Sequence, residues 1–196
     1  EVIMLLMEAL KRYQQRFPHE DKKVETFLHF LKQHPNPFDR SLSVWHFTGS
    51  AWLINQTKTH VLLTLHKKLN KWLQLGGHAD GNSDLHSVAL REAHEESGIS
   101  PLRSLSEEIF DLDIHRIPEN SKEPAHLHYD VSFVFQTVDS EIPVLSEESH
   151  SLEWVDMMKL ESYTQESSML RMRSKWESFE WEAILFLESS YGWFLL

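Results

Sequence analysis

The spacing of apolar residues predicts that the chain begins with two helices. Between residues 1 and 16, apolar side chains recur every three or four positions, as on one face of a helix: Ile3, Leu6, Leu10 and Tyr13. Pro18 interrupts this pattern, and a second helix is expected over residues 21–33, before the prolines of the sequence HPNP. These helices form either a lid or dimerisation arm, or a cap that covers a sheet.

The middle of the chain mixes strand-like and helix-like patterns. Apolar runs predict strands at residues 43–54, 60–65, 126–137 and 152–155. Turn-forming residues at 55–58 indicate a hairpin between the first two. A helix is expected over residues 84–97, ended by Gly98 in a left-handed cap, and another begins at 156–161. This order predicts an α+β or α/β fold.

The segment from 77 to 99 concentrates acidic side chains at helical spacing. Glu92, Glu95 and Glu96 are three and four positions apart, so they share one helix face. Three carboxylates on one turn repel each other, which a packed site tolerates only if cations fill it; the alternative is a solvated surface face. Oxygen ligands of this kind favour Mg²⁺ or Mn²⁺. Arg91 can pair with a carboxylate and fix its direction.

The same segment, GHADGNSDLHSVALREAHEESGI, resembles the Nudix box. In that pattern a glycine is followed after five residues by glutamate and after seven more by R-E-U-x-E-E-x-G-U, where U is aliphatic. The residues in register are Gly77, Arg91, Glu92, Ala93, Glu95, Glu96, Gly98 and Ile99. Ser83 replaces the first box glutamate, and the flanking Asp80 and Asp84 are candidates to substitute for it. Residues 77–99 are called the box segment below.

The resemblance implies a Nudix fold, which is an α+β fold (an α/β/α sandwich) with a mixed β-sheet flanked by helices. It extends over residues 44–165, where the flanking strands match those that frame the box. We therefore expect residues 1–40 to form an N-terminal helical extension, and residues 41–196 to form the Nudix domain with a C-terminal helical tail. The apolar run 176–196 either packs on this domain or forms a dimer contact.

The resemblance also implies an activity, that of a metal-dependent pyrophosphohydrolase. Its expected substrate is a nucleoside diphosphate linked to another moiety, cleaved at the diphosphate bond with Mg²⁺ or Mn²⁺. The implied metal ligands are Glu92, Glu95 and Glu96, and the implied structural residues are Gly77, Arg91 and Gly98. The general base is expected to be Glu95, Glu96 or a glutamate of a later loop, Glu147 or, preferably, Glu148.

Histidines near the box segment form a second group of candidates. His66 and His78 bracket the approach to the box, and His126 and His128 alternate on a predicted strand, so they share one face. They form either a site for substrate phosphate or a second metal, or an ordinary hydrogen-bonded polar face of the sheet.

The composition of the chain limits its domain count and the classes of ligand and chemistry that it can use. The 196 residues suit one domain with an elaboration, or at most two small ones, and the formal net charge of −11 disfavours nucleic acid. An anionic substrate would be repelled as well, unless bound cations reverse the local sign. The absence of cysteine excludes thiolate nucleophiles and cysteine-based zinc sites. No apolar run reaches membrane-spanning length, and no signal peptide is apparent. The absence of cysteine fits a reducing cytoplasm, and a homodimer is possible.

Two rival functions fit the same fold. One is an isomerase similar to isopentenyl diphosphate isomerase, whose metal-binding histidines resemble the placement of His66 and His78. That chemistry also uses a cysteine, which this chain lacks. The other is a catalytically weak or inactive nucleotide sensor, but such domains usually lose box glutamates or carry a DNA-binding domain.

Overall fold

The computed structural model describes residues 2–34, 36–39, 45–119, 124–147 and 149–178. Two helices, α1 (Val2–Arg16) and α2 (Asp21–Gln33), are joined by a short 3₁₀ turn, η1 (Pro18–Glu20). The strands are β1 (Trp45–Ile54), β2 (His60–His66), β3 (Lys71–Leu73), β4 (Leu75–His78), β5 (Leu102–Ser104), β6 (Asp111–Ile117), β7 (His126–Thr137) and β8 (Ser149–Asp156). Helix α3 (Leu85–Ser97) follows β4, and the 3₁₀ helix η2 (Met157–Ser162) follows β8. Residues 167–178 are also helical.

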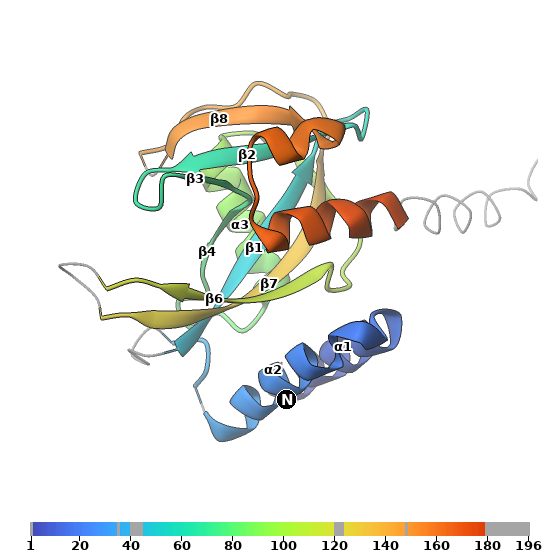
Figure 1. Ribbon diagram of the computed structural model, residues 1–196, viewed down its shortest axis with the longest axis vertical. Helices are drawn as coiled ribbons and strands as arrows, with labels where there is room; N and C mark the ends of the chain where they lie inside the picture. The colour runs from blue at the N-terminus through green and yellow to red at the C-terminus, as the bar shows by residue number, and fades with distance from the viewer. Residues whose placement is uncertain (1, 35, 40–44, 120–123, 148, 179–196) are drawn as a thin grey trace, which may run out of the picture.

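The described strands form one mixed sheet of eight strands. At its centre, β1 and β7 run parallel over the whole length of β1, from Trp45 beside Leu127 to Ile54 beside Gln136. Strand β1 pairs antiparallel with β4 near its beginning and with β2 at its end, so the expected hairpin of the first two strands is confirmed. The α+β class is therefore confirmed, with helices on both sides of the sheet (Figure 1).

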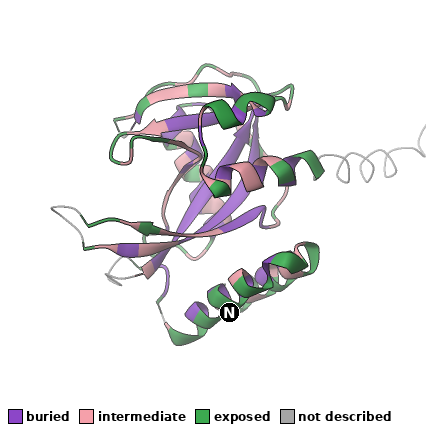
Figure 2. Cartoon of the chain, in the orientation of Figure 1, coloured by how far each residue is buried: buried purple, intermediate pink, exposed green. Residues whose placement is uncertain are grey.

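Each face of the sheet carries its own apolar core. Because side chains alternate along a strand, Phe47 and Leu53 of β1 contribute to one core, and Trp52 and Ile54 to the other. The first core is shared with α1, α2 and α3, and the second with η2 and the helical segment 167–178. Figure 2 shows that the central strands are buried along most of their length.

Helix α2 packs its aromatic side chains directly on the sheet. Phe30 stacks on Tyr129 of β7 with ring centroids 4.3 Å apart, and Phe27 meets the same ring edge-on at 5.1 Å. Phe47 of β1 lies within 5.9 Å of both phenylalanine rings. These contacts support the interpretation of the N-terminal helices as a cap on the sheet.

A buried ionic network connects this cap to the rest of the molecule. Lys175, from the helical segment 167–178, lies 2.7 Å from Glu20 of η1 and 2.6 Å from Asp111 of β6. The hydroxyl of Tyr13 in α1 donates to Glu20 at 2.6 Å, and Arg171 pairs with Asp111 at 2.7 Å. Segments that are distant in sequence are thereby held together by paired charges with little access to water.

The expectations for the ends of the chain are met only in part. Trp176, at the start of the apolar run, is 3% exposed and lies in the second core, whereas residues 179–196 are outside the described part.

No helix within the described ranges has the length and apolar character needed to cross a bilayer.

Candidate active site

Helix α3 presents two of its glutamates to the glycine pair at the end of β4. Glu96 is 7% exposed, and its Oε2 accepts a 3.2 Å hydrogen bond from the backbone N–H of Gly76. At Gly77, a Cβ would stand 2.4 Å from Cδ of Glu92, so only glycine leaves room for that carboxyl group. The box segment therefore folds into a unit in which the carboxylates of one helix face lie against bare backbone.

The ends of α3 explain why this helix begins and stops where it does. The carboxylate of Asp84 accepts the backbone N–H of Ser87 at 3.1 Å, which caps the first turn. Gly98 ends the helix with φ +66°, a left-handed conformation that favours glycine, and its N–H donates to His94 O at 2.9 Å. The predicted helix over 84–97 and its cap are confirmed. Ser83 lies half-buried just before the cap.

Arg91 links the helix to the strand that precedes it. Its Nη2 lies 2.8 Å from Oε1 of Glu92 and donates to the backbone carbonyl of His78 at 3.0 Å. The Glu92 side chain is only 14% exposed, so this ion pair is partly shielded from water. Arg91 is therefore placed to fix the direction of the Glu92 carboxylate.

The remaining acidic candidates differ in position. Glu95 is exposed on the surface of α3, and Glu147 is exposed in the loop before β8, where its carbonyl accepts from Lys67. Glu148, which the sequence favours as the general base, lies outside the described residues.

The two carboxylates beside the glycine pair are of the type that a hard divalent cation binds. Glu92 and Glu96 present carboxylate oxygens from successive helical turns, whereas Glu95 is exposed on the same helix. The room left by Gly77 at the Glu92 carboxylate is a feature of this chain that favours oxygen ligation close to the backbone. Mg²⁺ and Mn²⁺ prefer such ligands and retain waters that phosphate oxygens can replace.

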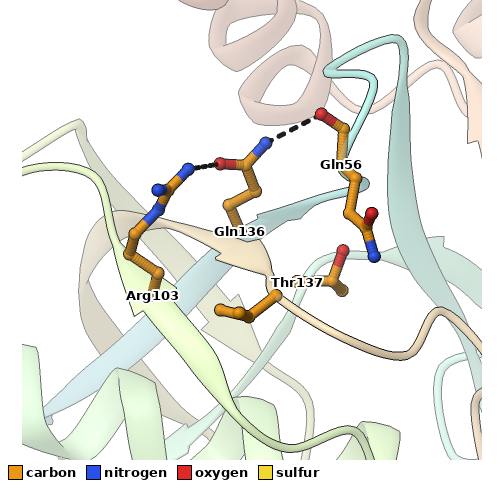
Figure 3. Close-up of a pocket in the computed structure, with 5 residues that line it drawn as sticks. Gln56, Arg103, Gln136 and Thr137 are labelled. Carbon is orange, nitrogen blue, oxygen red and sulfur yellow. Dashed lines mark hydrogen bonds between the residues drawn. The ribbon is translucent and has the colours of Figure 1, made fainter.

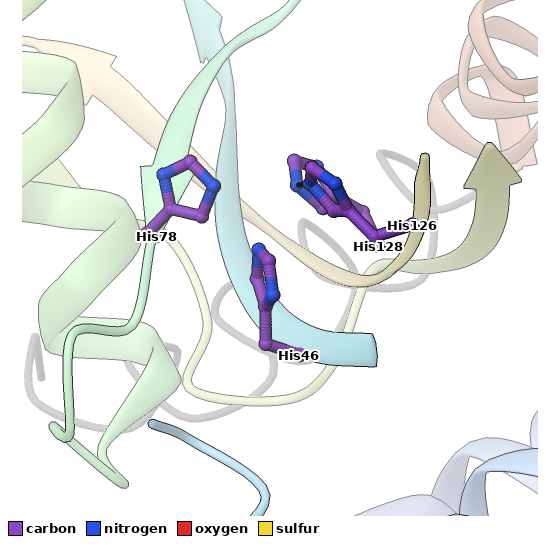
Figure 4. A group of neighbouring side chains, drawn as sticks. All are labelled: His46, His78, His126 and His128. Carbon is purple, nitrogen blue, oxygen red and sulfur yellow. Dashed lines mark hydrogen bonds between the residues drawn. The ribbon is translucent and has the colours of Figure 1, made fainter. Parts of the chain in front are cut away.

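Histidines from three strands meet on the sheet face opposite α3. The structure brings together three of the sequence candidates, His78, His126 and His128, and adds His46 of β1 (Figure 4). His66 is not part of this group; its Nδ1 accepts backbone N–H groups of the turn after β2, that of Lys68 at 3.2 Å. The sequence did not point to His46, because it stands far from the others along the chain, at the start of β1.

The chemical state of His128 follows from its surroundings. Burial lowers the pKa of His128, and the neighbouring histidines, beginning with His115, lower it further. His115 itself is held near Asp113, with Nδ1 3.3 Å from the carboxylate, and this contact raises the pKa of His115 against the opposing effect of burial. Both effects favour the neutral form of the His128 imidazole.

Beyond the histidines, the same face carries a buried carboxylate that the sequence did not single out. Asp130 is 1% exposed, and its Oδ1 accepts hydrogen bonds of 2.6 Å from both Thr48 and Ser50 of β1. Ser132 donates to its other oxygen at 3.2 Å. Burial raises the pKa of Asp130, while His115 and the hydroxyl donors oppose that rise. The carboxyl group joins β1 to β7 through polar contacts inside the fold.

Two hollows in the described surface lie away from the box segment. One, of about 400 Å³, is lined by Arg116, Pro118, Glu119 and Ala125. Another, of about 220 Å³, lies at the end of β7 remote from the histidines (Figure 3). There Arg103 donates to Gln136, which in turn donates to the carbonyl of Gln56 at 3.0 Å. None of the described residues that line these two hollows belongs to residues 77–99.

Comparisons with known proteins identify the family of the chain and support its fold. The family model for the NUDIX domain matches residues 44–175. A solved hydrolase of the NUDIX family from Clostridium perfringens is 27% identical, with a TM-score of 0.53, and the match covers 68% of this chain and 97% of that one. A MutT protein from Methanosarcina mazei Go1 is 21% identical, with a TM-score of 0.50 and coverage of 72% and 96%. The search of curated proteins gave no match.

Proposed function

We propose that this chain, which belongs to the NUDIX family and is a Nudix-type pyrophosphohydrolase, cleaves the diphosphate bond of a nucleoside diphosphate linked to another moiety. The observation that supports the site is the contact of Glu92 and Glu96 with the glycine pair Gly76 and Gly77. We propose Glu92, Glu95 and Glu96 as the ligands of Mg²⁺ or Mn²⁺.

A bound cation would offset the repulsion between this acidic protein and its anionic substrate. With a formal net charge of −11, the protein repels a diphosphate, and the carboxylates of α3 strengthen that repulsion locally. When bound, a divalent cation neutralises the diphosphate and acidifies a water molecule. The substrate therefore enters only where cation charge outweighs that of the protein.

Residues of the protein orient the metal-binding carboxylates and deprotonate the attacking water. Arg91 holds the carboxylate of Glu92, and the backbone N–H of Gly76 holds that of Glu96. Both side chains are therefore already oriented before the substrate binds. As the base that takes the proton of the attacking water we propose Glu148, which is not among the proposed metal ligands; Glu95 and Glu96 are the alternatives. The water oxygen bonds to one phosphorus, and the bridging P–O bond breaks to release the second phosphate group.

A panel of nucleotide sugars, dinucleotides and nucleoside triphosphates, incubated with Mg²⁺, tests this function. Hydrolysis of at least one compound to two phosphate-containing products, absent when EDTA is added, is the expected result. Tight binding of a nucleotide without turnover would indicate a sensor and contradict the proposal. The variant Glu107→Gln, which removes an exposed carboxylate outside residues 77–99, should behave like the wild type.

A further inference from the structure

The four histidines on the sheet are brought together by strand register. His46 of β1 is directly beside His128 of β7, and His78 of β4 is beside Thr48, two residues along β1 from His46. His126 lies two residues before His128 and so projects from the same face. One ring nitrogen from each of the four lies within 4.8 Å of all the others (Figure 4). The backbone of the central sheet therefore sets this convergence.

A hydrogen bond outside the group fixes the tautomer of one member. Nδ1 of His126 lies 2.9 Å from the carbonyl of Pro124, which can only accept, so this nitrogen carries the proton. In a neutral ring the lone pair is then on Nε2, which lies 3.0 Å from Nε2 of His128. Histidines that ligate metals usually donate their other ring N–H to a carbonyl or carboxylate in this way.

We propose that His46, His78, His126 and His128 hold a divalent transition-metal ion of the zinc type, at a site separate from the carboxylates of the box segment. Imidazole nitrogen suits Zn²⁺ and its neighbours in the transition series, whereas Mg²⁺ prefers oxygen. Tetrahedral ligation at about 2.0–2.1 Å requires nitrogens roughly 3.4 Å apart, which small inward movements of these rings achieve.

Burial and local charge favour an ion at this place. His46 and His126 are only 6% and 5% exposed, so the site is inside the sheet face and not on a solvated surface. The buried carboxyl group of Asp130 follows on the same face, two residues along β7 from His128. Four neutral imidazoles would leave the full charge of the ion, and that charge would favour the ionised form of this carboxyl group against the effect of burial.

The ion would act on the box segment by position. The ion would join β4, through His78, to β1 and β7. The backbone carbonyl of His78 accepts a hydrogen bond from Arg91, and the neighbouring Gly77 lies against Glu92. Because successive side chains point to opposite faces, His78 projects away from the side of β4 that meets Glu92. The histidine site would therefore stabilise the sheet on the face opposite the proposed catalytic site. Its existence does not depend on the hydrolytic activity.

Cobalt binding tests the site without an activity assay. The full chain is stripped of metal, loaded with Co²⁺, dialysed, and examined by elemental analysis and visible absorption. About one retained ion per chain with the strong visible bands of tetrahedral cobalt, displaced by Zn²⁺, is expected. His126→Asn and His128→Asn should each weaken binding more than about 100-fold, since even the outer-shell partners of a metal ligand contribute about 10- to 100-fold. His150→Asn, which removes an exposed histidine, should retain the ion.

Three results would overturn the proposal. The first is a wild-type protein that retains no cobalt or gives only the weak spectrum of octahedral oxygen ligation, which would leave a plain N–H···N bond between His126 and His128. The second is equal loss in His126→Asn and His150→Asn. The third is loss of the ion in Glu92→Gln or Glu96→Gln with retention in the histidine variants, which would move it to the box segment. The wild-type spectrum decides the matter even if a histidine variant fails to fold.

Discussion

Gly77 lies directly against the carboxyl group of Glu92, so that a Cβ added to the glycine would stand 2.4 Å from Glu92 Cδ. A methyl group there must push the carboxylate away from its place beside the strand. We predict that Gly77→Ala lowers kcat/KM by about 100-fold, the effect expected for a displacement of about 1 Å in a catalytic group. Steady-state hydrolysis of the best panel substrate at fixed Mg²⁺ measures this effect.

Gly81→Ala is the matched control for that variant. Gly81 has φ +84°, so alanine strains its backbone, but a Cβ there meets nothing within 4 Å. It should cost about 1 kcal/mol of stability or somewhat more and leave turnover unchanged. If Gly77→Ala retains wild-type kcat/KM, the contact with Glu92 has no catalytic importance.

The carboxyl group of Asp130 is predicted to stabilise the fold through its hydroxyl donors. Asp130→Leu would leave the hydroxyls of Thr48 and Ser50 without their buried acceptor, at a cost of about 1–3 kcal/mol for each. Asp130→Asn keeps an oxygen acceptor and should lose much less. Denaturant unfolding monitored by circular dichroism compares them, and equal midpoints for the two variants would refute this account.

The buried network around Glu20 predicts a specific dependence of stability on acid. Burial alone would raise the pKa of Glu20, but hydrogen bonds from Lys175, Lys23 and Tyr13 lower it to about 2 from 4.5. Because the folded pKa lies below the unfolded one, the stabilisation is complete above about pH 4.5 and is lost as the pH falls toward 2. It amounts to at most about 3 kcal/mol.

Glu20→Gln isolates this contribution. The difference in unfolding free energy between the wild type and Glu20→Gln should be largest near neutral pH and shrink between pH 4.5 and 2. Glu25→Gln changes an exposed carboxylate of α2 and should show little difference at any pH. A constant difference across this range would mean that the ion pair with Lys175 does not hold the pKa of Glu20 down.

The parts of the fold that the sequence predicted are those with strong local signals. Helix α3 has a capping aspartate, Asp84, and a left-handed glycine, Gly98, and β1, β2 and β7 are rich in apolar residues. Strand β6 was not predicted, because Asp111, Asp113 and His115 give it a polar sequence. In the structure these residues find partners in Arg171, in Lys175 and on neighbouring β7, which no local pattern reveals.

The histidine group, too, could be predicted only in part from local sequence patterns. The alternation of His126 and His128 along the chain is enough to indicate that the two share one face of a strand. That His46 joins them depends on the parallel pairing of β1 with β7, a contact between segments distant in sequence. His66, which the sequence grouped with His78, belongs instead to the turn that follows β2.

The most direct test of the proposed catalytic site is the Mg²⁺ dependence of hydrolysis in Glu96→Gln. Glutamine keeps the size of the side chain and can still accept from the N–H of Gly76, but it removes the charge that a cation requires. We predict a loss in turnover of at least about 100-fold, only partly recovered at higher Mg²⁺, with the wild-type unfolding midpoint retained. Turnover of Glu96→Gln at the wild-type rate, with the same Mg²⁺ dependence, would contradict the account.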